Sequence, residues 1–328
     1  MADEARSVDG LAAAGGATQA DEPGRSAPGL RALVEGATRL LAQAGVGSPR
    51  PDALALAAYA LGRDRVDLVL PPPLPEGFAT AYAALVERRR RREPLQHITG
   101  RTAFRHLTLR VEPGVFVPRP ETEVVAQVAV DEAARLAAAG RAPLVVDLCT
   151  GAGGIAVAVA TEVPAAHVVA VDVAAQAVAL TADNARRNGA GGLQAEQGDV
   201  RDTGLLAALA GQVDVLVSNP PYVPPDAEPV DPEVRDHDPD LALYGGGADG
   251  LDLPRAVLAA AARLLRPGGL LVMEHAEVQD ATVRAAALAT GVLVDVTTRT
   301  DLTGRPRMVV ARRVGAPGAP SPVGDSQP

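Results

Sequence analysis

The 328-residue sequence contains one cysteine and no lysine. A lone cysteine, Cys149, excludes a disulfide framework and a cysteine-built zinc site, and it fits a reducing compartment. Uncharged apolar runs stay well short of the roughly 18 residues that cross a bilayer. The first residues, Met1-Ala2-Asp3-Glu4, lack the basic-then-apolar pattern of a signal peptide. We therefore expect a cytoplasmic protein that does not associate with a membrane.

The chain also lacks a net positive charge. The formal net charge of −9 argues against a protein that nucleic acid holds through a general positive field. Residues 29–92 are the exception at +4, whereas the chain after residue 92 carries −10. Hydrophobic residues make up 47% of the chain, which is enough for a core and excludes a wholly disordered protein. The composition fits an acidic globular protein, and we expect no DNA partner.

The N-terminal part of the chain has apolar residues at helical spacing. The helical patterns cover residues 30–44, 52–61, 64–70 and 78–92. They predict a small helical domain over residues 29–92. After Pro94, short runs of β-type residues broken by glycines predict a β-hairpin linker over residues 93–118. These runs are residues 95–98, 101–104 and 107–111. Residues 1–28 and 315–328 lack sustained periodicity, and we predict that both are disordered tails.

From residue 119 to residue 314, strand-like and helical stretches alternate. The strand-like runs are residues 144–148, 168–171, 193–197, 213–218, 270–274, 292–297 and 308–311, of which the third is the least apolar. This alternation predicts an α/β domain with a mostly parallel sheet that helices cover on both faces. The last two runs lack a long crossover helix between them, so we expect an antiparallel pair at the edge of the sheet.

A loop of small residues, Asp147-Leu148-Cys149-Thr150-Gly151-Ala152-Gly153-Gly154, follows the first strand and opens a helix. Small residues let a ligand approach the backbone, and a helix start offers free N–H groups. Asp172 follows 21 residues after Gly151, near the spacing of a carboxylate that binds ribose hydroxyls. Asp199 follows the third strand and can accept a hydrogen bond from an adenine amino group. Because Asp147 precedes the loop, a cationic ligand such as S-adenosylmethionine fits better than a diphosphate; a strand-to-helix turn without any ligand is the alternative.

A second loop, Asn219-Pro220-Pro221-Tyr222, follows the buried strand at residues 213–218. The prolines push Asn219 and Pro220 toward extended backbone angles and fix the direction of the Pro220 carbonyl. That carbonyl and the Asn219 side-chain oxygen are two aimed acceptors, which match a planar NH₂ group with two donors. The Tyr222 ring can stack on the flat acceptor. The loop therefore predicts methyl transfer to an amide or exocyclic amine, with Asn219, Pro220 and Tyr222 as catalytic residues.

With these two loops the sequence resembles the class I S-adenosylmethionine-dependent methyltransferases, and more closely the PrmC/HemK family of release factor glutamine methyltransferases. The resemblance covers roughly residues 30–312. Besides the two loops, it includes Pro94–Gly100, Val117–Glu123, Leu241–Gly246, Asp249–Leu251 and Asp301–Arg305. It implies a helical substrate-recognition domain, a β-hairpin linker and a Rossmann-like catalytic domain over residues 119–314. It also implies methylation of the glutamine in the Gly-Gly-Gln motif of class 1 peptide chain release factors, an event of translation termination.

The resemblance also assigns residues to the site. The cofactor residues would be Asp147, Leu148, Cys149, Thr150, Gly151, Asp172, Val200 and Asn219, together with Asp199 as argued above. Residues 219–222, including Pro221, would hold the glutamine, and Phe116 and Arg119–Glu121 would close over it. Cys149 stands where the family has the first loop glycine, so we expect strain there but a preserved loop. Val200 stands where an aromatic residue could stack on adenine, so we expect a weaker contact.

Three other functions share some of these features. A DNA adenine methyltransferase would use the same acceptor loop, but it would need a basic surface. Methylation of a ribosomal-protein glutamine cannot be distinguished from the loop alone. A cofactor-binding protein without activity would not need Asn219 and Tyr222.

Several further groups have more ordinary interpretations. Arg88–Arg92 is expected to be a solvated helix end, with docking of an acidic face of the release factor as the sharper hypothesis. The five histidines are too scattered for a metal site, so none is predicted. Glu274 and His275 are interpreted as structural residues or as residues behind the site. The acidic stretch Asp231–Asp240 is expected to be a mobile loop near the mouth of the site.

Overall fold

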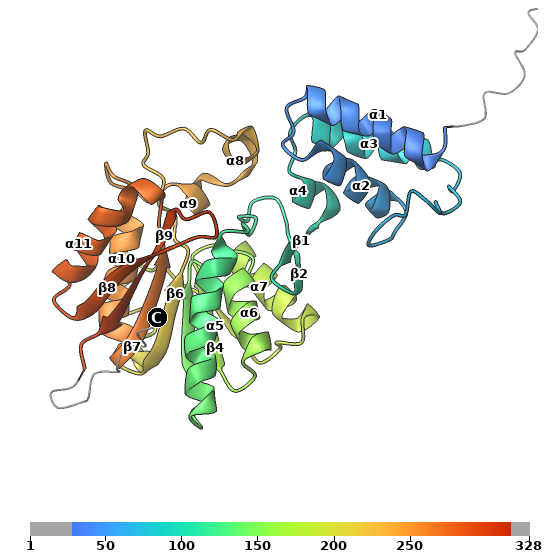
Figure 1. The fold of residues 1–328 in the computed structure, drawn as a ribbon. Coiled ribbons are helices and arrows are strands. Elements are labelled where there is room, and N and C mark those ends of the chain that lie inside the picture. Colours follow the sequence, from blue (N-terminus) through green and yellow to red (C-terminus); the bar gives the residue numbers. More distant parts are fainter. Residues whose placement is uncertain (1–27, 316–328) are drawn as a thin grey trace, which may run out of the picture.

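The computed structural model describes residues 28–315, and the two predicted tails therefore lie outside the described residues except for Pro28 and Gly315. Four helices, α1 (Leu30–Gln43), α2 (Pro49–Ala60), α3 (Phe78–Arg90) and α4 (Leu95–Thr99), form one body beside the sheet (Figure 1). Leu41, Leu56 and Tyr82 are buried in its core. The Tyr82 hydroxyl also donates to the Ala53 carbonyl at 2.9 Å, which joins α3 to α2.

Two local predictions in this region are wrong. Residues 64–70 form bends and irregular structure instead of a helix, because the Asp67 carboxylate accepts from the backbone N–H groups of Val69 and Leu70 and so satisfies them locally. Residues 95–98 form helix α4 instead of an extended run. Pro94 precedes this helix and Gly100 ends it in the left-handed conformation, with φ of +68°. A four-residue run is too short for its periodicity to decide between helix and strand.

The predicted hairpin is present as β1 (Arg101–Phe104) and β2 (Leu107–Arg110), paired antiparallel. The Phe104 and Leu109 side chains are buried in the core of the sheet domain, not in that of the helical body. The hairpin therefore anchors the connection between the two bodies to the sheet side.

The sheet domain alternates strands and helices as predicted. Its elements are α5 (Thr122–Ala138), β3 (Leu144–Leu148), α6 (Gly154–Glu162), β4 (His167–Asp172), α7 (Ala175–Arg187), β5 (Gln194–Gln197), η1 (Ala207–Leu209), β6 (Val213–Ser218), α8 (Pro232–His237), α9 (Asp240–Leu243), α10 (Asp252–Leu264), β7 (Leu265–Glu274), η2 (Glu277–Gln279), α11 (Asp280–Ala289), β8 (Leu293–Thr300) and β9 (Pro306–Arg313). The strand order is β5-β4-β3-β6-β7-β9-β8. β9 runs antiparallel between β7 and β8, so the expected antiparallel pair lies at the edge, with β8 outermost.

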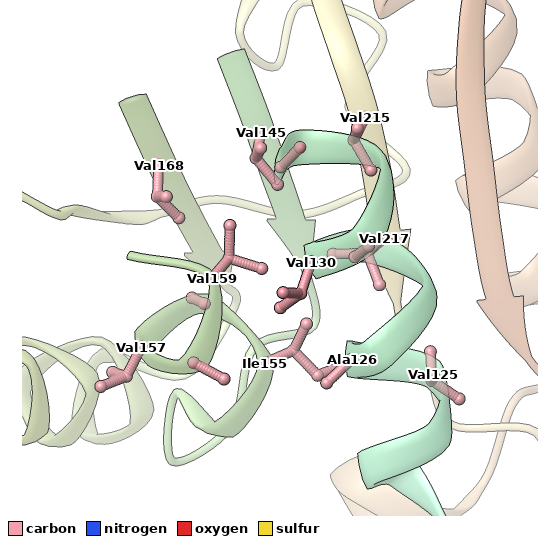
Figure 2. Close-up of a cluster of buried hydrophobic side chains, with 14 of the residues drawn as sticks. Val125, Ala126, Val130, Val145, Ile155, Val157, Val159, Val168, Val215 and Val217 are labelled. Carbon is pink, nitrogen blue, oxygen red and sulfur yellow. The ribbon is translucent and has the colours of Figure 1, made fainter. Parts of the chain in front are cut away.

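Alternating side chains build the two faces of the sheet. Val145, Val168 and Val215 point to one face and pack against apolar residues of α5 and α6, as Figure 2 shows. Val146, Val169 and Leu216 point to the other face, which α10 covers at β6 and β7 and α11 covers at β8 and β9. The result is a three-layer α/β/α domain in which β3 and β6 are buried on both faces. None of the helices between residues 28 and 315 has the length and apolarity needed to cross a membrane.

Ion pairs join the helical body to the segment that follows β6. Arg89 is 4% exposed and contacts Asp52 at 2.7 Å and Glu233, from α8, at 2.8 Å. Arg92 contacts the same Glu233 carboxylate at 2.9 Å. The expectation of a solvated helix end is therefore wrong for Arg89. The expectation of a loop over 231–240 is also wrong, because this stretch forms α8 and the start of α9, although its expected place near the site agrees with Val234 and Pro239 in the cavity lining.

Candidate active site

A cavity of about 510 Å³ lies at the carboxyl ends of β3 and β6, the two neighbouring strands between which the strand order reverses. Open α/β sheets bind ligands at this switch point, because two neighbouring strands there lead into loops that diverge. Apart from Pro120, the site residues predicted from the sequence line this one cavity: Phe116, Arg119, Glu121, Asp147, Leu148, Cys149, Thr150, Gly151, Asp172, Asp199, Val200, Asn219, Pro220, Pro221 and Tyr222. We call residues 147–154 with Asp172 the cofactor half, and residues 219–222 with the segments that hold them the acceptor half.

Asp147 forms the floor of the cofactor half. Its Oδ2 accepts from the Thr150 hydroxyl at 2.7 Å and from the Ala156 backbone N–H at 3.2 Å. Its Oδ1 is buried and has no hydrogen-bond partner among residues 28–315. Burial raises the pKa of this carboxyl to about 7. A buried carboxylate oxygen without a partner is an acceptor that a cationic donor such as an ammonium group would satisfy.

Asp172 shapes the wall of the same half. One carboxylate oxygen accepts from the Gly151 backbone N–H at 2.9 Å and the other accepts from the Ala174 backbone N–H at 2.9 Å. Each oxygen keeps a further lone pair, which could accept from a hydroxyl. Asp199 differs, because its carboxylate is held by Arg201 through contacts of 2.6 to 3.1 Å. An adenine amino group would therefore share Asp199 with Arg201.

Cys149 has φ of +60°, in the left-handed region that favours glycine. The strain expected at this family departure is thus present in the backbone, and the loop is nevertheless formed. The strand ends on either side are tied together, since the Ser218 hydroxyl donates to the Leu148 carbonyl at 2.7 Å. Burial raises the pKa of the Cys149 thiol, so the thiol stays protonated and unreactive at neutral pH.

The acceptor half has two oxygens without a hydrogen-bond donor in the described part of the chain, on two residues that line the cavity, Asn219 and Pro220. Asn219 donates through Nδ2 to the Thr122 hydroxyl oxygen at 3.2 Å, which leaves its Oδ1 available. In the described part of the chain, no backbone N–H donates to the Pro220 carbonyl. The Tyr222 hydroxyl donates to Glu274 Oε1 at 3.4 Å, and burial raises the pKa of this phenol. The ring of Tyr222 therefore has a fixed orientation at the cavity wall.

Backbone contacts hold the acceptor loop in place. Val223 donates to the Leu243 carbonyl at 2.8 Å and accepts from the Gly245 N–H at 3.0 Å. The Gln279 amide donates to the Tyr222 carbonyl at 2.7 Å. A Cβ atom on Gly250 would lie 2.4 Å from the Tyr222 carbonyl oxygen, so only glycine fits there. The Leu241–Gly246 and Asp249–Leu251 motifs thus serve to clamp the acceptor loop.

The rim of the cavity contains the other predicted substrate residues. Arg119 forms an ion pair with the buried Asp238 carboxylate, and its guanidinium lies 5.1 Å from the centre of the Phe116 ring. These contacts hold the α8–α9 segment over the cavity, and Leu241 and Val234 of that segment line it. Among residues 28–315 no cluster of three metal-ligating side chains is found.

Sequence reasoning gives no role to two side chains that act on the acceptor loop, Thr122 and Gln279. Glu274 is interpreted as structural or as a residue behind the site, and the structure places it behind the site, where it accepts from the Tyr222 hydroxyl. Its position at the end of β7, the strand beside β6, accounts for this placement. Gln279 lies on a short 3₁₀ turn and had no comparable signal.

The sheet order, the small-residue loop after β3 and the acceptor loop after β6 define a class I S-adenosylmethionine-dependent methyltransferase fold. Two family models match the chain, the PrmC N-terminal domain over residues 32–100 and the methyltransferase small domain over residues 107–231. The release factor glutamine methyltransferase of Streptomyces coelicolor is 48% identical over 288 residues, which cover 87% of this chain and 98% of that protein. That of Mycolicibacterium smegmatis is 48% identical over 87% of this chain and 98% of its own. The chain belongs to the release factor glutamine methyltransferase family.

This family assignment confirms the resemblance stated from the motifs. A further relative, from Streptomyces pristinaespiralis, is 42% identical over 81% of this chain and 89% of its own. It is named a 4-amino-L-phenylalanine/4-methylamino-L-phenylalanine methyltransferase. Relatives at similar identity thus carry different substrate names, and the substrate has to be argued from the site.

Proposed function

We propose that this protein transfers a methyl group from S-adenosylmethionine to the side-chain amide nitrogen of the glutamine in the Gly-Gly-Gln motif of class 1 peptide chain release factors. The observation that supports this most is the pair of free acceptors, Asn219 Oδ1 and the Pro220 carbonyl, which line the same cavity as the unpartnered Asp147 oxygen. A carboxamide NH₂ group has two donors in one plane and can use both acceptors at once.

Asp147, Thr150, Gly151, Asp172, Asp199 and Val200 are proposed to hold the cofactor, with Leu148 and Cys149 in the loop between them. The residues present suit it: Asp147 Oδ1 can accept from an ammonium group, and the Asp172 carboxylate can accept from ribose hydroxyls. The cofactor would supply an electrophilic methyl group on a positive sulfonium. No general base is needed to start the reaction, because the proton can leave after transfer.

Asn219 and Pro220 are proposed to activate the substrate nitrogen. An amide nitrogen is a poor nucleophile because its lone pair is delocalised into the carbonyl. Hydrogen bonds that hold both N–H groups disfavour this delocalisation and direct the lone pair at the methyl carbon. Tyr222 and Pro221 would hold the flat amide, and Arg119 and Glu121 would close the cavity over it. Most of the rate acceleration would then come from orientation.

The partner is proposed to be a folded release factor, and the reaction is expected in the cytoplasm, where release factors act on ribosomes. DNA is disfavoured as a substrate by the charge of −10 after residue 92. A free aryl amine could also use the two acceptors, as the name of the S. pristinaespiralis relative illustrates.

The test is mass spectrometry of purified release factor after incubation with the protein and S-adenosylmethionine. We expect one added methyl group on the glutamine of Gly-Gly-Gln, and none when that glutamine is replaced by alanine. Parallel reactions contain a DNA duplex, ribosomal proteins or 4-amino-L-phenylalanine. Methylation of any of these at a higher kcat/KM than the release factor would contradict the proposed substrate.

A further inference from the structure

The Asn219 side chain can present either an oxygen or an NH₂ group to the cavity, because the two ends of a carboxamide have nearly the same shape. Only the oxygen accepts a hydrogen bond from a substrate N–H. In the structure, Nδ2 is directed to Thr122 Oγ1 at 3.2 Å, so Oδ1 is the end left for the substrate. Something must favour this orientation over the reversed one, in which the Thr122 hydroxyl would donate to Oδ1.

Thr122 is the first residue of α5 and is 5% exposed. A hydroxyl has one proton to donate and two lone pairs that accept. If its proton goes elsewhere, the oxygen can only accept from Asn219, and the amide must present Nδ2 to it. The direction of the Thr122 proton therefore decides the orientation of Asn219.

Glu274, the last residue of β7, is 1% exposed and lies next to the Tyr222 hydroxyl. Its Oε1 takes the Tyr222 hydroxyl at 3.4 Å. Its Oε2 is buried and forms no hydrogen bond of its own with residues 28–315, so it can take a further proton donor. Thr122 and Tyr222 line the same cavity, and the Thr122 hydroxyl lowers the pKa of the Glu274 carboxyl as a donor. An ionised carboxylate can only accept hydrogen bonds. The Thr122 and Tyr222 hydroxyls can therefore act toward Glu274 only as donors.

We propose that Glu274 is a positioning residue for methyl transfer: as a carboxylate it takes the protons of Thr122 and Tyr222, so that Thr122 accepts from Asn219 Nδ2 and Asn219 Oδ1 faces the substrate amide. The inference rests on the proposed function, since it explains why Asn219 presents an oxygen, and not an NH₂ group, to the substrate amide. Glu274 acts through Thr122 and Tyr222 and does not itself touch the substrate.

The proposal makes activity depend on the charge of Glu274. Protonated Glu274 carries a proton of its own and no longer fixes the direction of the Thr122 proton. Burial raises the pKa of Glu274 to about 7, while Thr122, Arg307 on β9 and Tyr222 lower it and Glu121 raises it. We therefore expect kcat to rise as the pH increases through about 7.

The experiment compares Thr122→Val, Thr122→Ser and Glu274→Gln with the wild-type protein on an intact release factor. Valine matches the shape of threonine but has no hydroxyl, whereas serine keeps the hydroxyl. We expect Thr122→Val to lose about tenfold or more in kcat with nearly unchanged KM and cofactor Kd, and Thr122→Ser to stay within about threefold of wild type. Glu274→Gln should lower kcat and remove the pH step near 7. Calorimetry measures the cofactor Kd, and thermal melting reports folding.

Each other outcome is decisive. If Thr122→Val retains wild-type kcat, or if Glu274→Gln keeps the pH step, the inference is wrong while the proposed function stands on the wild-type activity. If Thr122→Val loses kcat only together with cofactor affinity or melting temperature, or if Thr122→Ser loses as much, Thr122 has a merely structural role and the inference is wrong. If the wild-type protein does not methylate the release factor, the proposed function fails, and this inference fails with it.

Discussion

The cofactor half of the cavity is formed largely within residues 147–172, whereas the acceptor half is assembled from segments between Thr122 and Gln279. In the cofactor half, Asp172 accepts from a backbone N–H of the loop that follows β3, and Asp147 accepts from a backbone N–H of the helix α6 that this loop opens. In the acceptor half, Asn219 depends on Thr122, 97 residues earlier, and Tyr222 depends on Glu274, 52 residues later. Local loop geometry can therefore preserve cofactor binding when the acceptor half is disturbed, and the two halves should fail separately under mutation.

Asn219→Ala should give the largest difference between the two halves, because methyl transfer should be lost while cofactor binding is kept. It removes one of the two acceptors, so transfer to the release factor should fall by about 100-fold or more, because misplaced reactants lose much of the benefit of orientation. Cofactor Kd should stay within about threefold. Single-turnover rates and calorimetry measure the two effects. Asn188→Ala, at a residue that does not line the cavity, serves as the control. A near-normal rate for Asn219→Ala would contradict the role assigned to this side chain.

Gly250→Ala tests whether the acceptor loop depends on its clamp. The new Cβ would lie 2.4 Å from the Tyr222 carbonyl oxygen, so the loop has to move. We expect about a tenfold or larger loss of kcat and a stability loss of about 1–3 kcal/mol, with cofactor Kd little changed. Gly189→Ala is the matched control, because Gly189 also has positive φ but no atom within 4 Å of its Cβ position. Equal kcat losses in the two variants would show that the contact with Tyr222 is irrelevant.

The two buried acids should respond differently to the cofactor. Burial raises the pKa of Asp147 to about 7 and that of Glu274 to about 7. A cation bound at Asp147 Oδ1 would lower the pKa of Asp147, so cofactor binding at pH 7 should release a fraction of a proton. Calorimetry in buffers of different ionisation enthalpy measures this release. The proton release should vanish in Asp147→Asn and persist in Glu274→Gln. If it vanished only in Glu274→Gln, the acid that responds to the cofactor would lie in the acceptor half, which contradicts the account.

The same acids make the stability of the free protein depend on pH. A carboxyl whose pKa is higher in the folded state than in the unfolded chain binds its proton more tightly when folded. Its contribution is therefore complete below the unfolded pKa and is lost as pH rises through about 7. Denaturant melts should show stability falling by a few kcal/mol from about pH 4.5 to 7.5, and less in Asp147→Asn or Glu274→Gln. A melt with no such decline would contradict the assigned pKa values.

Cys149→Gly should have the smallest effect. Glycine removes the cost of a side chain at φ of +60°, about 1 kcal/mol, but it increases the freedom of the unfolded chain by a similar amount. We expect the free energy of unfolding and the cofactor Kd to change little, as thermal melting and calorimetry would show. A loss of stability above about 2 kcal/mol would mean that the thiol packing is important.

The sequence predicted most of the fold because its signals are local. The alternation of Val145 and Val146 to opposite faces of β3 makes a doubly buried strand visible in a few residues. The cofactor half was predicted for the same reason, since Asp147, Gly151 and Asp172 lie at fixed short spacings. The stretch 64–70 misled because Asp67 satisfies backbone N–H groups by a side-chain contact that competes with a helix.

The rest depended on contacts that no local pattern encodes. The Arg89–Glu233 pair joins residues 144 positions apart, and without it the arginine run looks like a solvated surface. Glu274 likewise looks like an ordinary strand end until β7 lies beside β6 and brings it to Tyr222. Burial gives such groups their pKa and their role, and burial by distant segments becomes visible only in the fold.

The most direct measurement of the central claim is a crystal structure of the protein with S-adenosylhomocysteine and a Gly-Gly-Gln peptide from a release factor. The glutamine NH₂ group should donate to Asn219 Oδ1 and to the Pro220 carbonyl, with its nitrogen facing the cofactor sulfur. A complex in which residues 219–222 face away from the bound cofactor, or in which Asn219 presents Nδ2 to the glutamine, would contradict the account.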